Sequence, residues 1–291
     1  MATLPAADAV TLELEEIILA AQRWGDPDAP LILALHGWLD NSESFALLGP
    51  ELAEAGYQVL ALDWAGHGHS GHRAEGNHYL FLEYLYDLHR VVLSLGQPIH
   101  CLLGHSMGGI LAQLYAGLYP EHVHQLVAIE AVGPLISEPG KDAERLRRGF
   151  MSRLKRQGVR QGYDKLAPLA AARARSGDFD ERLARMLLSR NLEFRGRRWY
   201  WRSDSRLRER SAWMITEGQA RDYLSGYRRD SLVVLGEQGY PQLKTAWEQR
   251  QDWFYDVRRV DIPGGHHCHM ESVPELVQTL VTYLGGKPTV S

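Results

Sequence analysis

The sequence predicts an α/β protein: a mostly parallel central sheet flanked by helices, with one helical insertion. Two observations predict the sheet. Short apolar runs alternate with helical patterns over residues 11–129, and this alternation resumes near residue 231. A third observation predicts the insertion, since residues 134–230 are rich in arginine and helical in pattern. We therefore expect a core made of residues 1–133 and 231–291, with the insertion at 134–230 between its two parts.

The individual elements of the core follow from apolar runs and their spacing. After a leading strand or hairpin near residues 11–20, short apolar runs predict strands at 31–35, 57–62, 99–103, 126–129, 232–235 and 257–262. Apolar residues at three- and four-residue spacing predict helices at 44–55, 79–95, 107–119, 241–250 and 274–284. Strands and helices that alternate in this way are typical of parallel strands with helical crossovers.

Length and composition narrow the class of protein. A chain of 291 residues buries enough surface to fold without disulfides or metals, and its two cysteines, Cys101 and Cys268, fit a reducing compartment. Residues 1–10 lack the basic and apolar regions of a signal peptide, and no apolar run approaches the length of about 18 residues that a membrane span needs. We therefore expect a cytoplasmic protein without a membrane span.

The formal net charge of −4 hides a strong segregation of charge. Residues 141–230 hold 24 Lys+Arg against 12 Asp+Glu, a balance of +12, whereas the rest of the chain holds 8 against 24, a balance of −16. A surplus of one sign around a cleft steers an anionic substrate. It equally suits a solvated face, a complement to the acidic core, or a second subunit in a homodimer. Nucleic-acid binding is not expected, because acidic residues are interspersed with the arginines and no known motif is present.

One segment carries the signature of a nucleophilic serine. Residues 101–109 read CLLGHSMGG, which places G-x-S-x-G between a predicted strand and a predicted helix. The two glycines permit a sharp turn that exposes the hydroxyl of Ser106 at the end of the sheet. The helix that follows presents unpaired N–H groups to a developing negative charge. This context predicts that Ser106 is the nucleophile, whereas the motif alone would also suit a structural turn.

A second turn supplies the other half of an oxyanion hole. His36-Gly37-Trp38 follows the predicted strand 31–35. A tetrahedral intermediate needs donors that are fixed before its charge develops. We therefore expect the backbone N–H groups of Trp38 and Met107 to be the two donors.

The general base is expected near the end of the chain, because this arrangement follows the order Ser, then Asp or Glu, then His. Residues 263–271 read PGGHHCHME and follow the last predicted strand. His266, His267 and His269 compete there, and the preceding glycine pair favours His266. A metal site in this segment is not expected, because no spacing such as C-x₂-C accompanies the histidines. The histidines at 67, 69 and 72 are interpreted as part of a loop that follows Asp63.

Two glutamates are candidates for the acid that orients the imidazole. Glu130 stands directly after the predicted strand 126–129, just before the insertion. Glu237 stands in the turn Gly236-Glu237-Gln238-Gly239, which contains no aspartate. An acidic side chain directly after an apolar strand is unusual, and this favours Glu130 over Glu237.

Four stretches resemble the α/β-hydrolase superfamily, and together they extend along almost the whole chain. They read LHGWLDNSESF at 35–45, LDWAGHGHSGH at 62–72, LLGHSMGG at 102–109 and PGGHHCHMESVPE at 263–275. The chain looks closest to the serine hydrolase-like proteins and is similar in layout to the haloalkane dehalogenases. The resemblance implies the α/β-hydrolase fold, with the base five residues before Glu271, which selects His266, and with Asp63 in a structural role.

Gly239 departs from the pattern of most relatives, which carry the triad acid at that position. One branch of the dehalogenases instead carries a glutamate after the preceding core strand, at a similar separation from the nucleophile, and this strengthens Glu130. Dehalogenases need an aspartate nucleophile with a halide-binding tryptophan beside it. Ser106 and Met107 stand at those positions, so the resemblance disfavours dehalogenation.

These residues together predict a serine hydrolase that cleaves carboxylic esters through an acyl-enzyme intermediate. Ser106 attacks the carbonyl, His266 accepts its proton, and Glu130 holds the imidazole. No cofactor and no metal are expected, and the expected partner is a small-molecule ester, with anionic esters included. A thioesterase, a lactonase or a perhydrolase would use the same residues. A non-catalytic ligand-binding member of the fold is the alternative from another class of function.

By the same resemblance, residues 134–230 form a helical cap over the active site. Four aromatic residues of this segment are candidates to line an acyl pocket: Trp199, Tyr200, Trp201 and Trp213. Packing of the cap onto the core is the simpler expectation for any one of them.

Overall fold

A mixed sheet of eight strands lies at the centre of the computed structural model, which describes residues 6–155, 162–177 and 179–285. The strand order is β1-β2-β4-β3-β5-β6-β9-β10. Strand β2 pairs with β1 and with β4 in antiparallel direction, and all the other neighbouring strands of this sheet are parallel. The predicted α/β fold with a mostly parallel sheet is confirmed.

The bounds of the core elements agree closely with the predicted ones. The strands are β1 (Asp8–Glu13), β2 (Ile18–Trp24), β3 (Leu31–Leu35), β4 (Gln58–Leu62), β5 (Ile99–His105), β6 (Val123–Ile129), β9 (Asp230–Gly236) and β10 (Asp256–Ile262). The helices are α1 (Leu48–Glu54), α2 (Phe81–Leu95), α3 (Met107–Leu118), α8 (Pro241–Arg250), α9 (Cys268–Glu271) and α10 (Val273–Leu284). Short 3₁₀ turns occupy Ser42–Phe45, Pro120–His122 and Gln251–Trp253.

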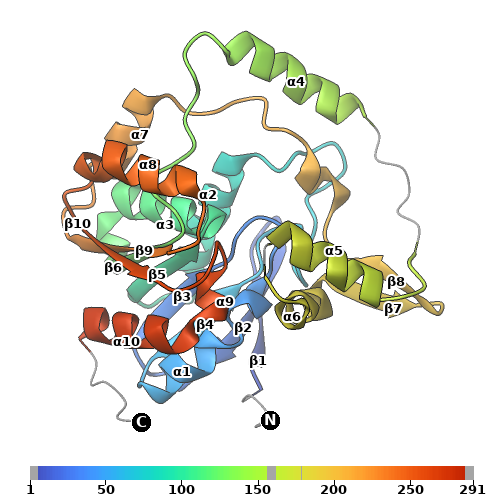
Figure 1. Cartoon of the computed structure of the whole chain (residues 1–291), viewed down its shortest axis with the longest axis horizontal. Helices are drawn as coiled ribbons and strands as arrows, with labels where there is room; N and C mark the ends of the chain where they lie inside the picture. Colours follow the sequence, from blue (N-terminus) through green and yellow to red (C-terminus); the bar gives the residue numbers. More distant parts are fainter. Residues whose placement is uncertain (1–5, 156–161, 178, 286–291) are drawn as a thin grey trace.

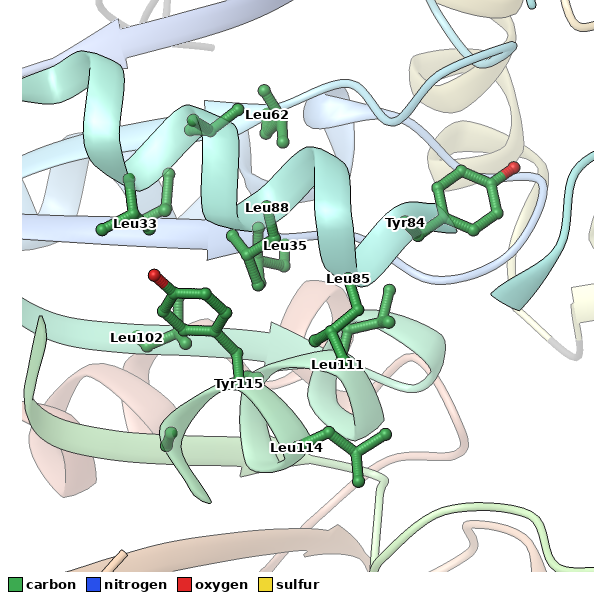
Figure 2. Packing of buried hydrophobic residues seen from close by; sticks show 14 of the residues in the cluster. Leu33, Leu35, Leu62, Tyr84, Leu85, Leu88, Leu102, Leu111, Leu114 and Tyr115 are labelled. Carbon is green, nitrogen blue, oxygen red and sulfur yellow. The ribbon is translucent and has the colours of Figure 1, made fainter. Parts of the chain in front are cut away.

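Helices cover both faces of the sheet, which explains why its central strands are continuous apolar runs. Alternate residues of a strand point to opposite faces, so Leu33 and Leu35 pack beneath α2 and α3, whereas Ile32 and Ala34 pack toward α1 and α10. Figure 2 shows the apolar cluster on the side of α2 and α3, in which Leu88 of α2 packs with Leu33 and Leu35 of the sheet. In Figure 1, α2, α3 and α8 lie on one side of the sheet, and α1 and α10 lie on the other.

The insertion between β6 and β9 contains more than helices. Its elements are α4 (Asp142–Leu154), α5 (Ala167–Gly177), α6 (Glu181–Asn191), β7 (Leu192–Arg195), β8 (Arg198–Trp201), a 3₁₀ turn at Ser205–Arg208 and α7 (Glu217–Leu224). The hairpin β7–β8 was not predicted. Its turn uses Gly196 and Arg197, both with positive φ, which is the backbone that a two-residue hairpin turn requires. The arginine-rich composition of this segment obscured the alternation of its strands.

Hydrogen bonds hold the insertion against the loops that follow β3 and β4. The guanidinium of Arg190 on α6 donates to Asp63 at 2.7 Å, and the side-chain amide of Asn41 donates to the Leu187 carbonyl at 2.9 Å. Both contacts lie at the carboxyl ends of parallel strands, where α/β folds bind their ligands. Within the described ranges, no helix has both the length and the apolar character needed to cross a bilayer.

Four histidines are buried without charge. Burial lowers the pKa of His36, His67, His105 and His269, and in His67 it lowers the pKa to about 3. His36 forms two specific hydrogen bonds, because its Nδ1–H donates to the Gly37 carbonyl and its Nε2 accepts from the Trp64 N–H. Nε2 of His67 accepts from the Leu39 N–H. These neutral imidazoles therefore act as fixed parts of the core.

We predict that the free energy of unfolding decreases as the pH falls below about 6.5. These histidines stay neutral in the folded chain but take up protons once the chain unfolds, so acid favours the unfolded state. For His67 alone the cost is about 2 kcal/mol at a pH of about 5. Urea unfolding at a series of pH values measures the effect, and a stability that stays constant through this range would contradict the assignment.

Candidate active site

Ser106 lies in a sharp turn between β5 and α3. Its backbone has φ 51° and ψ −116°, a strained combination that costs a non-glycine residue about 1–3 kcal/mol. The Ser106 N–H donates to the Ile129 carbonyl at 2.9 Å, which ties the turn to the end of β6. Gly108 permits close packing beside it, since a Cβ there would lie 2.1 Å from the Leu35 carbonyl oxygen. The first turn of α3 therefore approaches the loop that follows β3.

That loop holds the second expected oxyanion donor. Leu39 has a φ of 65°, and its N–H donates to Nε2 of His67 at 3.2 Å. The indole of Trp38 donates to the Leu207 carbonyl of the insertion at 3.0 Å. In the part of the chain that the structure describes, neither the Trp38 N–H nor the Met107 N–H donates to a protein acceptor. Both amides are thus available to a bound oxygen.

His266 connects the serine to an acid. Its Nε2 lies 3.0 Å from Oγ of Ser106, and its Nδ1 lies 2.9 Å from Oε2 of Glu130. The other two histidines of the loop turn elsewhere: Nε2 of His267 lies 3.2 Å from Asp40, and His269 bonds Ser44. Of the three competing histidines, the structure brings His266 to the serine.

Glu130 is held in place by its surroundings. It follows β6 with a φ of 51°, and its carboxylate accepts hydrogen bonds from the Gly236 N–H at 2.8 Å and the Tyr240 N–H at 3.4 Å. Glu237 is exposed and bonds the side chain of Gln238. The structure therefore brings Glu130, not Glu237, to His266.

Comparison with known proteins identifies the family of this chain. A model of the α/β-hydrolase fold family matches residues 30–273. The chain belongs to the α/β-hydrolase fold family. It is 30% identical over 281 residues to a probable serine hydrolase of Drosophila melanogaster, covering 91% of this chain and 83% of that protein. It is 25% identical over 264 residues to an sn-1-specific diacylglycerol lipase of Mus musculus, covering 89% of this chain and 82% of that protein.

A solved structure shares the fold of this chain along almost its whole length. The selenomethionine form of a hypothetical protein from Pseudomonas aeruginosa PAO1 is 34% identical, with a TM-score of 0.86 over 97% of this chain and 100% of that chain. The sequence resemblance to this superfamily is confirmed, and the relatives support a hydrolase at this level of description.

The unusual glycine at position 239 has a structural explanation. A Cβ on Gly239 would lie 2.3 Å from Oε1 of Glu130 and 2.7 Å from its carboxyl carbon. The carboxylate of Glu130 therefore occupies the space into which a side chain at position 239 would extend. A carboxylate beside His266 can therefore be carried by a side chain at position 130 or by one at position 239.

Two contacts of His266 were not predicted from the sequence. The ring of Tyr240 stacks on His266, with centroids 4.0 Å apart and planes 16° from parallel. Nε2–H of His105 donates to the His266 carbonyl at 2.8 Å. The sequence signal for the second contact is the position of His105 directly before Ser106, whereas nothing in the sequence pairs Tyr240 with His266.

A buried carboxylate joins the loops of the site to the insertion. Asp40 is 1% exposed; one of its oxygens contacts Arg173 of α5, and the other lies 3.2 Å from Nε2 of His267 and 3.7 Å from Nδ1 of His105. Burial by itself raises the pKa of Asp40, but His267 and Arg173 outweigh this effect and hold the pKa well below its usual value. Asp40 thus stays ionised two residues after Trp38.

The same residues are the candidate metal ligands. Within the described ranges, Asp40, His105 and His267 form the one group whose ligand atoms all lie within 4.8 Å of one another. Arg173 already gives the carboxylate a cationic partner in this arrangement. The expected absence of a metal remains a prediction.

We predict that the acid can be moved from position 130 to position 239. Glu130→Gln should lower turnover of a chromogenic ester by about a thousandfold or more, because the imidazole loses its anionic partner. Glu130→Ala combined with Gly239→Asp should recover a substantial part of that loss. Steady-state kinetics of both variants tests this.

The matched control is Glu237→Gln, which should leave turnover unchanged because Glu237 is exposed and does not contact His266. Full activity in Glu130→Gln would show that Glu130 is not the acid.

We also predict that Arg173→Met destabilises the fold by about 3 kcal/mol, because it leaves the buried Asp40 carboxylate with one partner fewer. Adding Asp40→Asn should recover part of the loss. Urea unfolding at neutral pH measures both changes. Arg185→Met is the control, since Arg185 pairs with Glu181 on the surface, with both side chains about half exposed. Equal effects of the two arginine substitutions would contradict the role of Asp40.

Proposed function

We propose that this protein is a serine hydrolase that cleaves carboxylic esters through an acyl-enzyme intermediate. The contact of His266 with both Ser106 and Glu130 carries the proposal, since activation of a serine requires a base that is itself held by an acid. The two free amides support it, because they are available to an oxyanion. A binding protein of this fold would need none of these contacts.

The proposed reaction has two halves. In the first, the hydroxyl oxygen of Ser106 forms a bond to the ester carbonyl carbon while its proton passes to Nε2 of His266. The N–H groups of Trp38 and Met107 stabilise the negative oxygen, and His266 then protonates the departing alcohol. In the second half, His266 takes a proton from water, whose oxygen forms a bond to the acyl carbon. The bond between that carbon and Oγ of Ser106 then breaks, His266 returns the proton to Oγ, and the acid leaves. Glu130 accepts the Nδ1 hydrogen bond throughout.

The acyl group is proposed to be apolar. A cavity of about 360 Å³ lies between the start of α2, the first residues of the insertion and its later segment 211–215. Its lining consists of Leu80, Phe81, Leu82, Glu83, Pro134, Leu135, Ser211, Trp213, Met214 and Ile215. Pro134 and Leu135 belong to the loop that follows β6 and begins with Glu130, so the cavity borders that loop, whereas Ser106 and His266 are not among its lining residues.

Trp213 is the one of the four candidate aromatics that lines this cavity. Trp199 and Trp201 instead pack against an apolar cluster that includes Leu188 and Leu192. The ring centroid of Tyr200 lies 4.5 Å from Cζ of Arg195. None of the described arginines of the insertion lines the cavity, and three of them, Arg145, Arg148 and Arg210, surround a separate surface hollow. We therefore propose a neutral acyl chain rather than an anionic one. The diacylglycerol lipase relative, which by its name acts on lipid esters, is consistent with this choice.

We predict that p-nitrophenyl esters of rising chain length are hydrolysed by the wild type and not by Ser106→Ala. In Leu135→Trp, which narrows the cavity, turnover of long-chain esters should fall by about tenfold while acetate turnover stays unchanged, because only the long chain needs the space. Parallel assays with thioesters and lactones then identify the preferred bond.

The control for this experiment is Leu93→Trp, which adds the same bulk on the exposed face of α2. No turnover by the wild type above the Ser106→Ala level would contradict ester hydrolysis. An equal effect of Leu135→Trp on acetate and on long chains would contradict the assignment of the cavity.

A further inference from the structure

One narrow side of helix α4 contacts residues 210–212 of the insertion. Gly149 lies against Ala212, because a Cβ on Gly149 would come within 2.5 Å of that residue. Oγ of Ser152 accepts a hydrogen bond from the Arg210 N–H at 3.0 Å. In Figure 1, α4 lies at the outer edge of the molecule, well away from the sheet. Most of the helix surface is therefore turned toward solvent.

Another side of α4 is apolar and exposed. Leu146, Phe150 and Leu154 recur at four-residue spacing and so share one face of the helix. Their exposed fractions are 44%, 51% and 74%, and Met151 beside them is 57% exposed. This face is turned by about 100° from the Gly149 side. Large apolar side chains gathered in water mark a contact surface.

Basic residues flank this apolar face. Arg153 and Arg147 stand on its two sides, and the described residues 141–155 hold six Lys+Arg against two Asp+Glu. One of those two acids, Glu144, is already paired with Arg148. The strongest part of the charge segregation in the sequence thus coincides with an apolar helix face. Apolar side chains flanked by cations are suited to bind an anionic lipid surface, in which acyl chains lie beneath negatively charged headgroups.

The apolar cavity opens beside the segment that holds α4. Met214 lines the cavity and its sulfur also contacts Arg145 of α4. Around the cavity, Trp213 is 51% exposed, Leu82 is 40% exposed and Leu135 is 69% exposed. Tryptophan is favoured at the boundary between water and lipid. The exposed apolar surfaces of α4 and of the cavity rim are therefore joined through segment 211–215.

We propose that α4 and the rim of the cavity dock onto an anionic phospholipid surface, from which the acyl chain of a lipid ester enters the cavity. The choice of substrate rests on the proposed ester hydrolysis, whereas the docking itself does not. Leu146, Phe150 and Leu154 insert between acyl chains, and the flanking arginines meet the headgroups. Each basic residue near such a surface strengthens binding roughly fivefold at low salt.

Flotation of the Ser106→Ala protein with vesicles tests the docking without any hydrolysis. The protein should float with vesicles that contain phosphatidylglycerol and remain unbound with pure phosphatidylcholine. Added salt should weaken the binding, because it screens the arginines. Phe150→Asp combined with Leu154→Asp should reduce binding by at least about tenfold. Leu93→Asp combined with Tyr255→Asp is the matched control, since these residues are 56% and 68% exposed elsewhere on the chain.

Hydrolysis of a soluble short-chain ester, measured with Ser106 intact, shows that each variant folds. If that activity is absent even in the wild type, ester hydrolysis is contradicted while the flotation result still decides the docking. Binding that persists in the Phe150→Asp/Leu154→Asp variant would overturn the proposal. A wild-type protein that is dimeric by light scattering, and monomeric in that variant, would also overturn it, because the face would then be an interface between two copies of this chain.

Discussion

The imidazole of His266 lies between a hydroxyl and a carboxylate, and the site depends on where three parallel strands end. Ser106 follows β5, Glu130 follows the neighbouring β6, and His266 follows β10. Because these strands are parallel, their carboxyl ends meet at one edge of the sheet. Ser106 and Glu130 both have left-handed backbones there, and the strain is maintained by the packing of the elements on either side.

Around this contact, buried polar groups hold the loops in place. His67 bonds the loop that carries Trp38, and His105 bonds the backbone of His266. Asp40 then links the loops after β3 and β10 to Arg173 of the insertion. An ionised carboxylate in an apolar interior is stable only with such partners. The position of the insertion and the geometry of the site are therefore physically coupled, although their residues lie far apart in the chain.

The insertion itself separates two kinds of surface. Its apolar residues line the cavity and one face of α4, while its described arginines surround a separate hollow, pair with the loops of the core or pair with acids of the insertion itself. This arrangement explains how residues 141–230, with a balance of +12, can border an apolar cavity. The even distribution that composition suggests is absent in space, because helix periodicity sorts the residues by face.

From the sequence alone, the fold, the turn at Ser106 and a histidine-rich loop after the last strand were accessible, because local patterns encode them: apolar runs between helices, a glycine-flanked serine, and three histidines that follow the last strand. His266 was favoured over His267 and His269, and the tertiary structure brought it to the serine. Glu130 was also favoured by a local pattern, but Glu237 remained a competitor until the tertiary structure brought one of them to the imidazole. The hairpin β7–β8, the stacking of Tyr240 and the Asp40 link were decided only by the fold. These contacts join residues that no periodicity relates, and burial alone makes their charges and hydrogen bonds matter.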